Sequence, residues 1–153
     1  MNDAYWEVKG LVASLQQYPD VNRMTPQHLD AFLAKCKLAE WEQDELSASS
    51  DKSKYYIDRI SWHRIYETRI TCGEFQRYLL KNGIFIPTDL KTKFSKLEEL
   101  IRSALIEHKV GKVHGVSNSM HKELTKLIEV GPGLLKNLEA EVQSRLWNSE
   151  LLL

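Results

Sequence analysis

Residues 52–81 read KSKYYIDRISWHRIYETRITCGEFQRYLLK, and this stretch decides the fold class. It contains no proline, and Gly73 is its only glycine. Thirty residues extend about 45 Å as an α-helix, which is long for a chain of this size. Two faces of the helical wheel are apolar, one with Ile57, Ile60, Thr68, Phe75, Tyr78 and Leu79, the other with Tyr55, Trp62, Tyr66 and Leu80. A helix that is apolar on two sides is expected between other helices, so we place it at the centre of a bundle.

A second interpretation divides this helix at Thr71. Thr71 and Glu74, just before Phe75, have the form of a capping box that would begin a new helix. Such pairs also occur by accident inside helices, so we favour one continuous helix over residues 52–81.

The apolar residues on either side also recur at helical spacing, and no long stretch alternates as a β-strand does. Capping residues, glycines and prolines set the expected helix limits, which are about 3–17, 25–46, 88–111, 119–130 and a last helix from Pro132. Thr25 and Thr88 are the expected N-caps of two of them, Gly111 is an expected stop, and Gly131-Pro132-Gly133 is expected to break the chain. Asn82-Gly83 should end the long helix, because both residues tolerate the left-handed conformation. The apolar connector Ile84-Phe85-Ile86 is expected to pack across helix ends.

The sequence therefore predicts an all-α fold, a compact bundle of five or six helices around the long central helix. The chain of 153 residues suits a single helical domain, with residues 1–46 as a two-helix N-terminal part and 52–153 as the main bundle. Lys plus Arg and Asp plus Glu both number 21, and 42% of the residues are hydrophobic. This balance is atypical of disordered chains and of strongly basic nucleic-acid binders.

The cysteine count and the apolar runs bear on the compartment. Cys36 and Cys72 form no CxxC motif and are expected to be reduced thiols packed inside the protein. The start of the sequence has no basic and apolar signal-peptide pattern, and no apolar run approaches the length that spans a membrane. We expect a soluble cytoplasmic protein that does not bind membranes.

Motifs of catalysis and cofactor binding are missing. The sequence has no GxxxxGK[ST] or GxGxxG phosphate loop, no HExxH, no Glu-x-x-His pair and no GxSxG. His108, His114 and His121 are near one another in sequence, but a polar stretch separates them. We expect no metal and no cofactor, and we favour a non-enzymatic role over catalysis.

Arg102 and His108 carry the one enzyme interpretation. HEPN ribonucleases are all-α domains of this size with an Arg followed by a His after four to six residues, and Arg102 and His108 resemble that pattern. The resemblance implies a ribonuclease or RNA-binding domain with these two residues as catalytic candidates. In a straight helix the two side chains differ by about 240° around the axis, which leaves them about 120° apart, so they would meet only at a bend or across a dimer axis.

The zero net charge conceals three charged stretches. Residues 39–51 carry five acids and no base, whereas 52–81 have a net charge of +4 and 109–126 of +3. Bases interleaved with aromatic residues can bind single-stranded nucleic acid, but we favour arginines of 52–81 that pair with the acids of 39–51. Arg64 lies on an apolar face and needs a carboxylate or an open pocket, which could hold a small anion. The candidate binding residues are Arg64, Lys109, Lys112, His114, His121, Lys122 and Lys126.

Surplus apolar residues favour an interaction function. The candidates for an interface are Trp6, Leu11, Trp41 and Trp147, with the leucines of 151–153. Because an exposed apolar patch normally marks an interface, we expect a protein-interaction module that binds a protein partner or itself, with a homodimer as the default. The alternatives are the HEPN-like ribonuclease or RNA-binding domain and an anion-sensing bundle with Arg64. Residues 66–94 and Arg145-Leu146-Trp147 are similar in general look to small bacterial helical proteins, which implies no particular activity.

Overall fold

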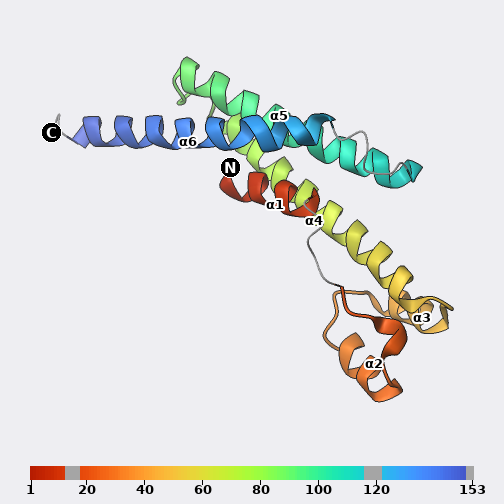
Figure 1. Ribbon diagram of the computed structural model, residues 1–153. Helices are drawn as coiled ribbons and strands as arrows, with labels where there is room; N and C mark the ends of the chain where they lie inside the picture. Colours follow the sequence, from red (N-terminus) through yellow and green to blue (C-terminus); the bar gives the residue numbers. More distant parts are fainter. Residues whose placement is uncertain (13–17, 116–121, 151–153) are drawn as a thin grey trace. The chain divides into compact units, whose positions relative to one another are not determined.

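The computed structural model describes residues 1–12, 18–115 and 122–150. In these ranges the chain forms six α-helices and one short 3-10 helix, and no strand is present among them (Figure 1). The all-α prediction is therefore confirmed. Contacts divide the chain into two compact units: unit 1 is Met1–Ala13 with Glu67–Leu153, and unit 2 is Ser14–Tyr66. The organisation into a single domain stays a prediction.

Helix α4, Lys52–Asn82, is continuous, as the sequence predicted. The alternative division at Thr71 is wrong, because the Thr71 hydroxyl donates to the carbonyl of Glu67 one turn earlier, inside the helix. The helix contributes its first half to unit 2 and its second half to unit 1. Tyr66 and Leu80, which belong to the second predicted apolar face, are exposed. That face is therefore not covered along its whole length.

Unit 2 contains the 3-10 helix η1 (Val21–Arg23) and helices α2 (Pro26–Leu33) and α3 (Glu40–Ala48). Thr25 caps α2 as predicted, since its hydroxyl accepts the N–H of His28. The expected single helix over 25–46 is wrong. Ala39 is extended and begins α3, where the buried carboxylate of Glu42 accepts the Ala39 N–H. Because the helix stops after α2 and restarts at α3, Leu38 lies in the connection between them. There it packs with Val21 and Leu46 in a small core.

Unit 1 packs α1 (Asn2–Val12) and the second half of α4 with the antiparallel helices α5 (Thr88–His114) and α6 (Lys122–Glu150) (Figure 1). Three polar contacts set the register of α5 and α6: Asp89 with Arg145, Lys93 with Glu141, and the Glu107 carboxylate with the backbone N–H groups of Glu123 and Leu124. The first turn of α5 therefore lies beside the last turns of α6. The core of unit 1 includes Leu97, Ile101, Leu127 and Leu138.

The predicted ends of two helices were wrong. Helix α5 passes through Gly111 and ends at His114, and the positive φ of 63° at the next residue, Gly115, gives the left-handed C-cap. Helix α6 passes through Gly131-Pro132-Gly133 without a break. The buried positions Leu124, Leu127, Gly131, Leu135 and Leu138 keep helical spacing on both sides of the proline, and this packing outweighs the lost backbone hydrogen bond.

Some predictions fall outside the described residues. They concern the end of the first helix over 13–17, the loop over 116–118 and the expected start of a helix at 119. Asn82 does end α4, but Gly83 lacks a positive φ. The backbone of Gly83 lies against the last turn of α4, where an added Cβ would be 2.7 Å from the carbonyl oxygen of Leu79. Gly83 is thus required by a close approach and not by left-handed geometry.

Candidate functional site

The turn between α4 and α5 carries the most conspicuous surface feature of unit 1. Ile84 is 83% exposed and Phe85 78%, so the expectation that they pack across helix ends is wrong. The N–H of Phe85 donates to the carbonyl of Asn82 at 2.9 Å, which closes a turn. A closed turn holds both side chains away from the core, and Ile86, the next residue, is half-buried. Two large apolar side chains are therefore presented to solvent by an ordered backbone.

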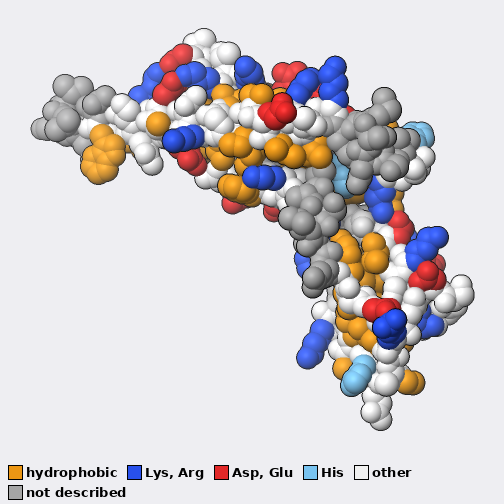
Figure 2. Space-filling view, in the orientation of Figure 1, with side chains coloured by type: hydrophobic (Ala, Val, Ile, Leu, Met, Phe, Trp, Pro, Cys, Tyr) orange, Lys and Arg blue, Asp and Glu red, His pale blue; other side chains and the backbone are white. Residues whose placement is uncertain are grey.

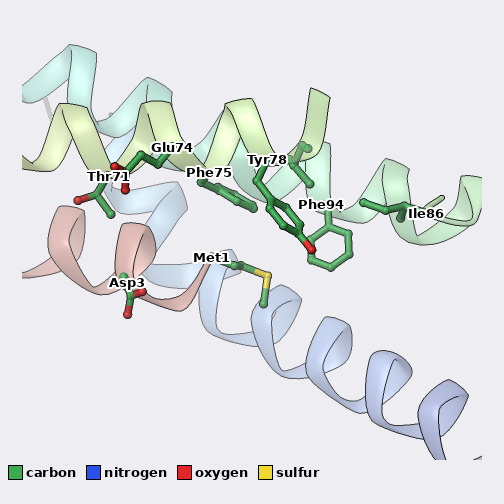
Figure 3. Close-up of a pocket in the computed structure, with 9 residues that line it drawn as sticks. Met1, Asp3, Thr71, Glu74, Phe75, Tyr78, Ile86 and Phe94 are labelled. Atoms are coloured by element: carbon green, nitrogen blue, oxygen red, sulfur yellow. The ribbon is translucent and has the colours of Figure 1, made fainter. Parts of the chain in front are cut away.

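A pocket of about 300 Å³ lies in unit 1 (Figure 3). It is lined by residues of α1, α4, α5 and the turn, namely Met1, Asp3, Thr71, Glu74, Phe75, Tyr78, Leu79, Ile86 and Phe94. Figure 3 shows Glu74, Phe75 and Tyr78 projecting from α4, with Met1 opposite them and Phe94 near Tyr78. The volume is at the lower end of the range for ligand pockets and suits a single large side chain.

The walls of the pocket are mainly apolar, and its two charged side chains are both acidic. Phe75 is buried, whereas Tyr78 at the rim is exposed. Asp3 and Glu74 line the pocket, and its lining includes no lysine or arginine. The pocket therefore favours a guest with an apolar body and a basic neighbourhood.

Contacts between α1 and α6 hold the pocket together. The side-chain amide of Asn2 donates to Glu139 at 2.8 Å. The buried Tyr5 ring lies against Gly131, where an added Cβ would be 2.6 Å from the ring carbon Cε2. Burial raises the pKa of Tyr5. These contacts fix the first turn of α1, which supplies Met1 and Asp3 to the pocket.

The predicted interface residues are placed unequally. Trp6, Trp41 and Trp147 are all more than half exposed, in agreement with a surface location. Leu11 is a correction, because it is only 6% exposed. It follows Ala4 and Val8 on the buried stripe of α1. The leucines of 151–153 lie outside the described residues.

Two of the three exposed tryptophans have cationic neighbours. Lys9 Nζ lies 4.7 Å from the ring centroid of Trp6, and the Arg59 guanidinium lies 5.1 Å from that of Trp41. A cation–π contact keeps an aromatic ring partly covered in the monomer. The surface of unit 1 mixes apolar side chains with charges of both signs (Figure 2).

The predicted pairing of arginines of 52–81 with acids of 39–51 is confirmed for Arg59 and Glu45. Arg59 forms an ion pair with Glu45 at 3.1 Å, and His63 Nε2 lies 2.8 Å from the carboxylate of Glu42. Burial by itself would raise the pKa of Glu42, but the Ala39 N–H and His63 together outweigh it and lower that pKa. These charges therefore serve the fold of unit 2.

Arg64 also lies in unit 2, half-buried on α4. Its guanidinium is 3.5 Å from the hydroxyl of Tyr18. A phenol neighbour is compatible with the predicted anion site but does not define it, so this role stays a prediction.

The predicted basic group is spread over two helices. Lys109, Lys112 and His114 lie in the last turns of α5, and Lys122 and Lys126 lie in the first turns of α6. Lys126 is paired with Glu123 at 2.7 Å. His121 lies outside the described residues.

The ribonuclease candidates lie on a single unbroken helix. Arg102 is paired with Glu98 one turn earlier, at 3.3 Å. His108 follows six residues later on α5, so the two side chains point about 120° apart. One chain does not bring them together on one face, and the catalytic hypothesis stays a prediction that needs a second copy.

Other chemistry has little support in the described part of the chain. No group of three or more His, Cys, Asp or Glu side chains there could hold a metal ion. Both cysteines are free. Burial, followed by the carboxylates of Glu7 and Glu98, raises the pKa of Cys72 to about 11, which suppresses the nucleophilic thiolate. None of the described helices is long and apolar enough to cross a membrane.

Comparison with known proteins found no matching family model, no matching curated protein and no matching solved structure. The functional argument therefore rests on the side chains themselves.

Proposed function

We propose that this protein is a non-enzymatic helical interaction module that self-associates as a homodimer. The observation that carries the proposal is the exposure of Ile84 and Phe85 on a hydrogen-bonded turn beside the pocket. Full burial of one such side chain is worth about 1.5–3 kcal/mol. An ordered turn that presents two of them gains this free energy on association with little further loss of conformational freedom.

The overall charge supports a second copy as the partner. The formal net charge is zero, so two copies do not repel each other at long range. Proteins near zero net charge tend to associate. The two free cysteines agree with a reducing compartment, and we propose the cytoplasm as the location.

Light scattering coupled to size-exclusion chromatography tests this proposal. Between about 1 and 100 μM, a range that brackets micromolar dimers, we expect the mass to rise from 17.8 kDa towards twice that value. A mass of 17.8 kDa at every concentration would overturn self-association.

A further inference from the structure

We infer that each copy in this dimer inserts the Ile84–Phe85 turn into the pocket of the other copy. The inference rests on the proposed self-association and adds which surfaces meet. Phe85 is the inserted anchor, and the guest of the pocket is a second copy of this chain. The interface is thereby assigned to a specific part of unit 1.

The first argument is that a protruding group and a hollow lie next to each other on one surface. Ile86 lines the pocket, whereas the two preceding residues of the same turn point to solvent. The turn is closed, so Phe85 does not fill the pocket of its own chain. A two-fold axis beside the turn makes the contact reciprocal, and such a contact closes after two copies.

The second argument is charge complementarity. The pocket has Asp3 and Glu74 in its lining, whereas Lys81 and Lys91 flank the turn. Lys91 covers the turn directly, since its Nζ would be 3.3 Å from a Cβ at Gly83. Within residues 1–12, 18–115 and 122–150, none of these four charges forms an ion pair. An apolar turn with basic flanks thus matches an apolar pocket with acidic walls.

The third argument is the chemistry of the pocket wall. Phe75, Tyr78 and Phe94 offer ring edges and faces to an incoming aromatic side chain. Aromatic rings prefer offset or edge-to-face contacts, and buried aromatic anchors dominate the energetics of most interfaces. A phenylalanine is therefore a better guest than a polar side chain.

Cross-linking between two different single-cysteine proteins tests the inference. Both carry Cys36→Ser and Cys72→Ala, with folding confirmed by circular dichroism; one adds Ile84→Cys, which keeps Phe85 in place, and the other Thr71→Cys. After mixing and mild oxidation we expect a disulfide-linked heterodimer, because each cysteine lies on one side of the proposed contact. Neither protein can form this bond within its own chain.

Glu129→Cys replaces Thr71→Cys in the matched control. Glu129 is exposed on α6, about 24 Å along the helix from Arg145 and the start of α5. The control pair should cross-link at least tenfold less. If light scattering shows a dimer but the Ile84→Cys and Thr71→Cys pair cross-links no better than the control, the reciprocal insertion is wrong while self-association stands.

Charge reversal gives a second, independent readout of the same contact. Glu74→Lys alone should weaken the dimer, because like charges then meet across the interface. The double variant Glu74→Lys with Lys91→Glu should recover the dimer, because the opposite charges meet again in each half. A double variant that is as weak as the sum of its single variants would contradict the proposed pairing.

Discussion

Gly131 lies where the ring of Tyr5 on α1 meets α6, and it shows how one residue governs the packing of unit 1. A Cβ at this position would be 2.6 Å from Tyr5, and the residue also precedes Pro132, whose ring disfavours a side chain in the helical conformation. Gly133, two residues later on the same helix, is exposed and would meet no atom within 4 Å. The packing of unit 1 therefore requires a glycine at position 131 but not at position 133.

Gly131→Ala and Gly133→Ala should change the free energy of unfolding in opposite directions. Overpacking against Tyr5 should cost Gly131→Ala about 1–3 kcal/mol. Gly133→Ala should gain about 0.5–1 kcal/mol, because alanine is the better helix former at a site with free space. Chemical denaturation followed by circular dichroism measures both. Equal stability of the two variants would contradict the described packing of α1 on α6.

At the scale of the elements, the sequence predicted what depends on local composition. The long α4 and the Thr25 cap were found because an unbroken run of helix formers and a capping hydroxyl act within a few residues. The break at Ala39 was missed, since no glycine or proline marks it and its cause is the burial of Leu38. The opposite error occurred at Gly131-Pro132-Gly133, where a continuous stripe of buried leucines overrides two glycines and a proline.

The candidate site was harder to predict than the helices. The residues of the turn were noticed, but their exposure depends on where α4 ends relative to α5. The pocket joins residues of α1, α4 and α5 that are up to 93 positions apart in sequence. The spacing of residues along one helix does not indicate which residues of other helices will line the same pocket. Trp6, Trp41 and Trp147, which the sequence named as interface candidates, are exposed.

The start of α3 predicts a pH dependence of unit 2. The pKa of Glu42 is lowered in the folded state, because the Ala39 N–H and His63 outweigh the opposing effect of burial. A lowered pKa stabilises the fold above the unfolded value of about 4.3, and this contribution is lost as the pH falls through the lower folded value. Glu42→Gln should therefore reduce the stability of unit 2 at neutral pH and flatten its loss in acid.

The comparison for this prediction is Glu40→Gln, an exposed glutamate in the same first turn of α3. Urea denaturation at several pH values between neutral and acid, monitored by tryptophan fluorescence, measures the slope. The Glu40→Gln slope should resemble that of the unaltered protein. If Glu42→Gln keeps the full loss of stability in acid, the Glu42 carboxylate does not hold the start of α3.

At the scale of the whole molecule, the two units differ in how their charged and apolar surface side chains are used. In unit 2, Glu45 of the acidic stretch pairs with Arg59 of α4, and Glu42 contacts His63. Unit 1 instead leaves Ile84 and Phe85 in solvent, next to a pocket lined by aromatic rings and two acids. We propose that association of two copies covers both features at once.

Sedimentation equilibrium of the unaltered protein and of Phe85→Ser tests this claim most directly. Phe85 is exposed, so its loss should leave the helical circular dichroism signal unchanged. The unaltered protein should be a dimer at tens of micromolar, and Phe85→Ser should dissociate about 30-fold more readily, the loss expected for a central anchor. Ile106→Ser, an exposed apolar change about 27 Å along α5 from Thr88, should leave the dimer intact. A monomeric unaltered protein, or a Phe85→Ser dimer of undiminished strength, would contradict the account.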